Sequence, residues 1–160
     1  MAAVGDWSAL TLCVHGDVVG EYGKALELTD ETIEANQQAD VTTAIAKAQE
    51  IIGRMLDASL EQYYGINLGS YTAAEDLKDH LANPEVLKYA CIAKTLEVLF
   101  RDNVLSEGDF NHVREKRFEK EFKKEYTIAV GKLRFDKDDD GDISDEELAS
   151  KMGSNRIVRV

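Results

Sequence analysis

The sequence predicts a mainly α-helical protein, a small helical bundle with extended N- and C-terminal arms. The segment from Asn83 to Asn103 is long and apolar on nearly every side, as expected of a buried helix. Residues 40–64 and 110–135 place apolar side chains at intervals of three and four, the period of an α-helix with one buried face. The chain has a single proline and no low-complexity run, and its 160 residues are enough to bury a core without disulfides.

The buried helix is well marked at its start. Asn83 is a favourable N-cap residue, Pro84 suits the first helical position, and Glu85 lies in the positive first turn. Within the helix, only Lys88, Lys94, Glu97 and Arg101 remain as a narrow charged edge. These charges interrupt the apolar run too often for a membrane span, so we expect a core helix with neighbours on several sides.

Shorter elements are expected before this helix. The N-terminal stretch, residues 1–23, reads as an arm in which residues 10–14 form either a short strand or an extended segment, and it has no secretory signal pattern. A short helix is capped at 28–30 and ends near Asn36, and Asp40 caps a second, amphipathic helix that ends at Tyr63 and Tyr64 before Gly65. Residues 65–74 are expected to be a loop and 75–81 a short helix.

After the central helix, a turn over 104–109 leads into a strongly charged helix from about Phe110 to Phe135. Its charge-rich half, residues 111–125, is most simply a solvated surface, although a docking surface remains an alternative. A short helix is expected over 144–152, and Gly153 ends it. The tail SNRIVRV, residues 154–160, is basic and β-branched; it either frays or becomes ordered against a partner.

The strongest chemical motif is DKDDDGDISDEE, residues 136–147, which matches the twelve-residue calcium loop of an EF-hand. Gly141 at the sixth position permits the sharp turn of such a loop, and Ile143 at the eighth is the apolar position that normally faces the core. Six positions would supply oxygen ligands: Asp136, Asp138 and Asp140 by carboxylate, Asp142 by its backbone carbonyl, Ser144 directly or through water, and Glu147 by both carboxylate oxygens. This EF-hand-like loop predicts a Ca²⁺ site, with Mg²⁺ possible.

The charge of this loop favours a bound cation. Six Asp and two Glu against one Lys give the twelve residues a net charge of −7, a repulsion that needs a cation or full solvation. An acidic surface loop that merely resembles the motif is the alternative. No second loop of this kind occurs in the chain, whereas calcium sensors pair two of them. We therefore expect a structural calcium site that fixes the angle between the long helix and the C-terminal tail.

Composition argues against several other functions. The formal net charge of −12 disfavours sequence-specific nucleic-acid binding. Cys13 and Cys91, the two cysteines of the chain, are expected to be buried thiols rather than a disulfide or a catalytic pair. The three histidines lie far apart in sequence, and no nucleophile elbow, zinc motif or Gly-rich phosphate loop is present. We therefore expect no enzymatic activity.

The order of these segments resembles that of the head-to-tail adaptor proteins of tailed bacteriophages, including the group related to the head-completion protein of phage Mu. The resemblance covers residues 25–135, and the EF-hand-like loop lies outside it. The segments that carry it are LTD at 28–30, AIAKAQEIIGRML at 44–56, the tyrosines at 63 and 64, NPEVLKYACIAKTLEVLF at 83–100 with its opening proline, and the charged helix that runs to Leu133.

The resemblance implies a structural virion protein, assembled in the host cytoplasm and located in the virion neck. It would form a homo-oligomeric ring that contacts the portal protein and the neck or tail-completion proteins, without a membrane partner. Residues 1–135 would be the helical adaptor domain with its N-terminal arm, and 136–160 the EF-hand-like loop, short helix and tail. The alternative is a soluble calcium-binding regulatory or interaction protein of cellular origin.

Overall fold

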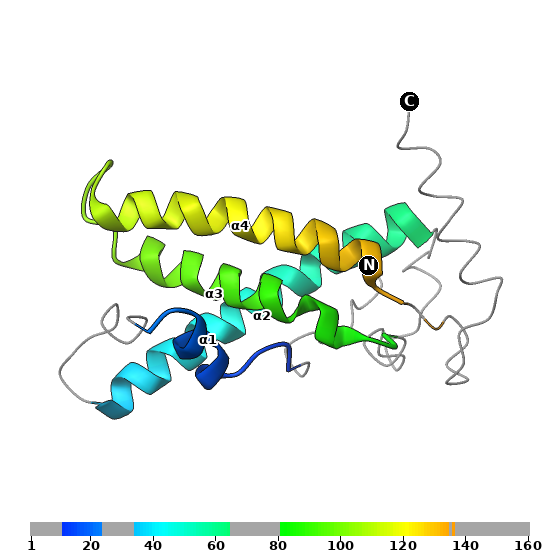
Figure 1. Ribbon diagram of the computed structural model, residues 1–160, viewed down its shortest axis with the longest axis horizontal. Helices are drawn as coiled ribbons and strands as arrows, with labels where there is room; N and C mark the ends of the chain where they lie inside the picture. Colours follow the sequence, from blue (N-terminus) through cyan, green and yellow to red (C-terminus); the bar gives the residue numbers. More distant parts are fainter. Residues whose placement is uncertain (1–10, 24–33, 65–80, 135, 137–160) are drawn as a thin grey trace, which may run out of the picture.

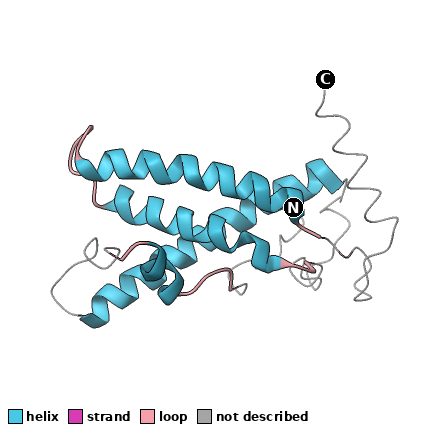
Figure 2. Cartoon of the chain, in the orientation of Figure 1, coloured by secondary structure: helices cyan, strands magenta, loops and turns pink. Residues whose placement is uncertain are grey.

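The computed structural model describes residues 11–23, 34–64, 81–134 and 136, and its regular elements over these ranges are helical (Figures 1 and 2). The elements are α1 (His15–Glu21), α2 (Glu34–Tyr64), the 3₁₀ turn η5 (Pro84–Leu87), α3 (Lys88–Asp102) and α4 (Phe110–Lys132). The prediction of a mainly α small bundle is therefore confirmed.

The bundle is built around α3. Helices α3 and α4 run antiparallel and share the most extensive interface, while α2 crosses α3 obliquely and α1 packs on both α2 and α3 (Figure 1). All eleven residues from Ala90 to Phe100 are buried. A helix enclosed on this many sides matches the central core helix that the sequence predicts.

Aromatic side chains close the core near the α3–α4 turn. Phe100 stacks on Phe118 with ring centroids 5.5 Å apart. Tyr22, just after α1, meets Phe100 edge to face at 5.4 Å and Phe118 at 6.0 Å. These contacts join the N-terminal segment, α3 and α4 into one core.

Two charged residues of α3 lie inside the bundle rather than on the expected charged edge. Lys94 and Glu97 are 9% and 6% exposed, and Lys94 Nζ donates to the Glu97 carboxylate oxygens at 2.7 and 2.8 Å. Lys94 Nζ also lies 4.8 Å from the centroid of the Phe122 ring on α4. The narrow charged edge expected on this helix does not include them, because α4 covers this side of α3 and the two charges satisfy each other instead.

The turn between α3 and α4 follows the expected range. Asp109 is the N-cap of α4, and its carboxylate accepts hydrogen bonds from the backbone N–H groups of His112 at 2.7 Å, Leu105 at 2.9 Å and Ser106 at 3.2 Å. These hydrogen bonds, that from His112 foremost, lower the pKa of Asp109. Gly108 has φ of +88°, a conformation that glycine adopts without strain.

Two details of the N-terminal half differ from expectation. The predicted break between Asn36 and Asp40 does not exist, because α2 runs without interruption from Glu34 to Tyr64 and Asp40 is an exposed residue within it. Residues 11–14 are not a strand, and Val14 has extended backbone, in keeping with the second alternative for this segment. Helix α1, which the sequence does not predict, follows them although Gly16 and Gly20 disfavour a helix. In α1 the buried Val18 provides the packing that outweighs this low propensity.

Other predictions lie outside the described residues. They are the loop at 65–74, most of the short helix at 75–81, the start of the helix at 28–36, residues 1–10 of the arm, the helix at 144–152, the tail at 154–160, and the predicted ligands Asp138, Asp140, Asp142, Ser144 and Glu147.

Candidate functional site

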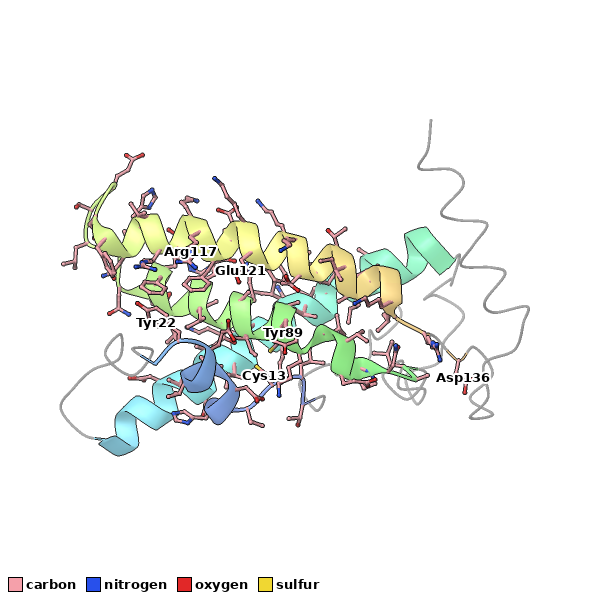
Figure 3. The ribbon with its side chains drawn as sticks, in the orientation of Figure 1. Cys13, Tyr22, Tyr89, Arg117, Glu121 and Asp136 are labelled. Carbon is pink, nitrogen blue, oxygen red and sulfur yellow. The ribbon has the colours of Figure 1, made fainter. Side chains whose placement is uncertain are left out.

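The entry to the acidic loop lies at the end of the bundle opposite the α3–α4 turn, where Figure 3 labels Asp136. Helix α4 ends at Lys132, and Leu133 follows it with 1% of its surface exposed. Asp136, the first predicted calcium ligand, is 5% exposed. The chain that leads into the predicted calcium loop is therefore packed against the bundle.

Asn83 ties this chain to the start of the central helix. Its side-chain Nδ2 donates to the backbone carbonyl of Lys132 at 3.0 Å, and its Oδ1 accepts from the backbone N–H of Arg134 at 2.6 Å. The backbone N–H of Ala82 donates to the Arg134 carbonyl at 3.1 Å. We call these three hydrogen bonds the Asn83 clasp.

The clasp changes the role that the sequence assigns to Asn83. Asn83 does precede the first helical turn, as predicted, but its side chain makes no capping hydrogen bond there. It joins two segments about fifty positions apart instead. A buried Asp136 just beyond these bonds is held in a defined place relative to α3, as a ligand needs to be if the ion is to find a preformed site.

The other five predicted ligands fall outside the described residues, so their arrangement around an ion stays a prediction. Within the described part of the chain, no three His, Cys, Asp or Glu side chains are grouped so as to hold a metal ion. Among the predicted ligands, only Asp136 is therefore placed by the structure.

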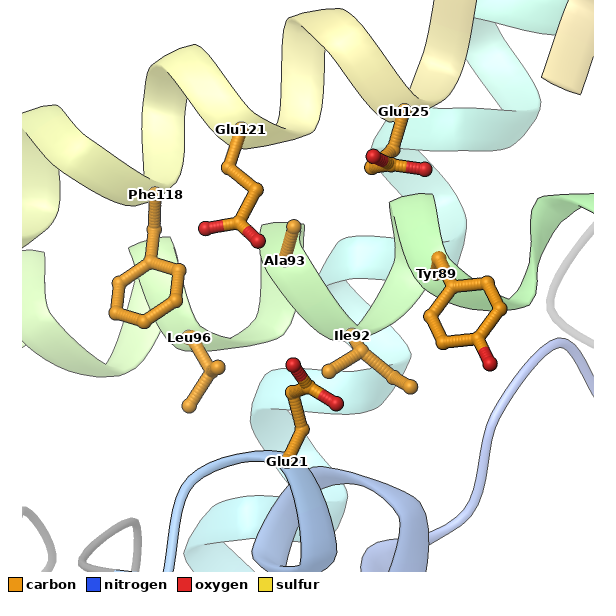
Figure 4. Close-up of a pocket in the computed structure, with 8 residues that line it drawn as sticks. All are labelled: Glu21, Tyr89, Ile92, Ala93, Leu96, Phe118, Glu121 and Glu125. Atoms are coloured by element: carbon orange, nitrogen blue, oxygen red, sulfur yellow. The ribbon is translucent and has the colours of Figure 1, made fainter. Parts of the chain in front are cut away.

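A second feature is a groove between α1, α3 and α4, shown in Figure 4, with a volume of about 310 Å³. Its floor is apolar and its rim carries three carboxylates and one exposed aromatic ring. The floor residues are Ile92, Ala93, Leu96 and Phe118, and the rim residues are Glu21, Tyr89, Glu121 and Glu125. We call this feature the acidic groove.

The carboxylates of the acidic groove come from two sides. Glu21 reaches the space from α1, and Glu121 points toward it from α4 (Figure 4). Within the described residues, Glu21 and Glu121 form no ion pair, whereas Glu125 lies 3.8 Å from Lys124 Nζ. Tyr89 is 63% exposed beside them. The groove thus combines negative charge with apolar surface, which suits a segment that carries both arginine and aliphatic side chains.

Sequence reasoning missed the acidic groove for two reasons. Glu21 could not be placed because α1 was not predicted, and residues 111–125 were interpreted mainly as a solvated surface. One signal was present: Glu121 and Glu125 are four positions apart, and like charges at this spacing oppose each other on a helix. Both are only partly exposed, whereas Lys123 and Lys124 between them are exposed.

Comparison of the chain with protein-family models, with curated proteins and with solved structures finds no match. Among the described helices, none combines the length and the apolar character that crossing a bilayer requires.

Proposed function

We propose that this chain is a structural protein of a bacteriophage neck, assembled in the host cytoplasm, that forms a ring between the portal and the tail or neck-completion proteins. One observation carries the proposal. Apart from the segment at 28–30, which lies outside the described residues, the segments that resemble the adaptor family in order fall on α2, on η5 with α3, and on α4. These helices form a single bundle around the family-like segment 83–100. The proposed role is one of assembly rather than catalysis.

In this proposal the acidic loop binds one Ca²⁺ per chain. The ligands would be Asp136, Asp138, Asp140, Asp142, Ser144 and Glu147, and a set that includes a bidentate Glu147 prefers Ca²⁺ to the smaller Mg²⁺. The Asn83 clasp supports the idea because it holds the entry of the loop on the bundle. Once bound, the ion would fix the direction in which the chain leaves α4.

Titration calorimetry tests the ion site directly. The parent chain should bind one Ca²⁺, while Asp136→Ala and Glu147→Gln should each weaken binding strongly. Asp109→Asn is the matched control, since this aspartate lies at the other end of α4. Equal Ca²⁺ binding by the parent and both loop variants, or no heat from the parent at millimolar ion, would refute the site.

The proposal assigns the acidic groove to the C-terminal segment of a neighbouring copy, residues 154–160. Arg156 and Arg159 would meet the carboxylates of Glu21 and Glu121, while Ile157, Val158 and Val160 cover the apolar floor. Charge complementarity supports this occupant, because SNRIVRV is a basic segment in a chain whose net charge is −12. Successive copies linked in this way would close into a ring.

A fluorescent SNRIVRV peptide tests the assignment on a chain shortened to residue 153. We expect saturable binding that falls at least tenfold in Glu121→Arg and persists in Glu107→Arg, a charge reversal in the exposed α3–α4 turn. Binding that is equally weak in both variants reflects net charge alone and contradicts the groove. If the peptide binds at the groove but the full chain stays monomeric, the tail occupies its own chain and the ring is wrong.

The second candidate function is that of a calcium-binding regulatory or interaction protein of cellular origin. The acidic loop is the feature that favours it. Negative-stain images of the purified chain separate the two functions. A neck adaptor should show rings or monomers that assemble readily. A calcium-responsive regulator should remain monomeric and should expose apolar surface, detected by a hydrophobic dye, only when Ca²⁺ is added.

A further inference from the structure

The two cysteines of the chain meet where the N-terminal segment crosses the central helix. Cys13 and Cys91 are 78 positions apart in sequence, yet their Sγ atoms lie 2.9 Å from each other. Both residues are buried, at 4% and 0% exposure, and both thiols are free. The pair was expected to be buried, but its direct contact was not.

The segment that carries Cys13 is held by contacts on either side of the sulfur pair. The backbone N–H of Leu12 donates to Gln49 Oε1 on α2 at 2.9 Å. On the other side, Lys88 Nζ of α3 lies 2.6 Å from the carboxylate of Asp17 in α1. These contacts fix the backbone on both sides of Cys13. The position of the Cys13 side chain beside Cys91 therefore follows from the fold.

We propose that Cys13 and Cys91 form a reversible disulfide site that staples the N-terminal segment and α1 to α3. The sulfur atoms need to approach by less than 1 Å, because a disulfide bond is about 2.05 Å long. The bond would close a loop between residues 13 and 91, which contains α1, α2 and the start of α3. It would add a covalent link where the segment is otherwise held by hydrogen bonds, an ion pair and packing.

A low-molecular-weight disulfide such as oxidised glutathione supplies the oxidising equivalents. The thiolate of Cys13 attacks one sulfur of that molecule, forms a mixed disulfide and releases the first glutathione thiolate. Cys91, after losing its proton, then attacks the Cys13 sulfur and releases the second. The protein gives up two electrons and two protons, and one oxidised glutathione becomes two reduced molecules.

The surroundings favour Cys13 as the attacking thiol. The hydrogen bond between the two sulfurs lowers the pKa of Cys13, against the opposing effect of burial. The same hydrogen bond, followed by burial, raises the pKa of Cys91. Cys13 lies in the irregular segment before α1, whereas Cys91 lies in the middle of the core helix, so opening of the N-terminal segment is the simplest route for the oxidant.

This disulfide site could serve the proposed neck protein, because the redox environment changes when a virion leaves the cell; this part of the inference rests on the proposed function. A neck protein is assembled in the cytoplasm, where thiols stay reduced, and leaves it when the virion is released into oxidising surroundings. The staple would then be open during assembly and closed afterwards. Disulfide formation is tested on the purified chain. A chain that does not form the disulfide is therefore distinguishable from one that does not form rings.

The reduced chain is incubated with oxidised glutathione under native conditions and analysed by intact mass and peptide mapping. We expect a monomer that has lost two hydrogen atoms, with a single crosslink between Cys13 and Cys91. In urea, this oxidised chain should unfold with an equilibrium constant about 30- to 900-fold smaller than that of the reduced chain. Cys13→Ala and Cys91→Ala should show no such difference between oxidising and reducing buffer.

A second variant tests the route of oxidation. Gln49→Ala removes the contact that holds Leu12, so the crosslink should form faster and with the same connectivity. Glu50→Ala, at the adjacent exposed position of α2, should form it at the parent rate. Disulfide-linked dimers, stable glutathione adducts without the internal crosslink, thiols that stay reduced, or an oxidised chain no more stable than the reduced one would each overturn the proposal.

Discussion

At the scale of single residues, Lys94 and Glu97 show how this bundle handles charge in its core. Their side chains are only 11% and 8% exposed, and each is the other's ion-pair partner. Removing one member of a buried pair leaves the other charge without compensation, whereas replacing both by apolar residues of similar size is often neutral or stabilising.

We therefore predict that Glu97→Ala costs about 3 to 5 kcal/mol of unfolding free energy. The double variant Lys94→Met with Glu97→Leu should recover most of this loss, since it leaves no unpaired charge beneath α4. Urea unfolding of the parent, single and double variants provides the measurement. A double variant that is less stable than Glu97→Ala would show that the charge pair itself stabilises this core.

The central helix and the following turn offer a matched pair of leucines. Leu99 is 5% exposed in the core and Leu105 is 93% exposed in the turn. Leu99→Ala should cost about 2 to 5 kcal/mol because it leaves a cavity. Leu105→Ala should stay within about 0.5 kcal/mol of the parent, as ordinary surface changes do. Urea unfolding that gives equal losses for the two variants would contradict the placement of α3 at the centre.

Residue-level sequence reasoning was right where burial follows from apolar character. It predicted a buried helix over residues 83–103, and Leu87, Cys91 and Leu99 within that helix all lie in the core. It was wrong for Lys94 and Glu97 because the period of one helix does not say how far a neighbouring helix extends over it. The contact between Cys13 and Cys91 could not be predicted from the sequence either. It depends on how the N-terminal segment, 78 positions before Cys91, crosses α3.

At the scale of elements, the long helices were predictable and the short ones were not. The expected ranges, 83–103 and about 110–135, lie within a few residues of η5 with α3 and of α4, and Pro84 marks the start of the first of them. Helix α1 has seven residues, two of them glycine, and depends on tertiary packing. Asp40 was interpreted as a cap, but the packing of Val41 and Ala44 on the core carries α2 through that position.

The Asn83 clasp is the element-scale feature that links the bundle to the acidic loop. Asn83→Ala removes two hydrogen bonds to the chain that leaves α4, and we expect a loss of about 1 to 3 kcal/mol in unfolding free energy. Ca²⁺ affinity should fall as well, because Asp136 would no longer be held in advance. Asn83→Asp, which keeps the acceptor but loses the donor, should be intermediate in stability.

Calorimetry and urea unfolding measure both effects of the Asn83 variants. Asn111→Ala is the control, since this asparagine makes one side-chain hydrogen bond, to the Asn103 carbonyl at the opposite end of α4. A loss of stability in Asn83→Ala with unchanged Ca²⁺ affinity would separate the clasp from the ion site.

At the scale of the whole molecule, the proposal joins two features that are distant along the chain. The ion would fix the turn beyond α4, and the tail at 154–160 would bind the acidic groove of the next copy. A flexible tail loses conformational entropy when it docks, and a bound ion removes part of that cost beforehand by restricting the chain. Ion and tail should therefore act as one unit in assembly.

Ring formation in the presence of Ca²⁺ tests this central claim most directly, measured by sedimentation velocity with negative-stain images of the same samples. The parent chain should form closed rings. Asp138→Ala and a chain ending at residue 153 should each lose them to a similar extent, and the combined variant should lose little more, because both changes interrupt the same step. Rings that form fully without the tail would contradict the docking of residues 154–160, and tail-dependent rings that are indifferent to Asp138→Ala and to chelation would contradict the coupling. A parent chain that remains monomeric with Ca²⁺ present would contradict the ring itself.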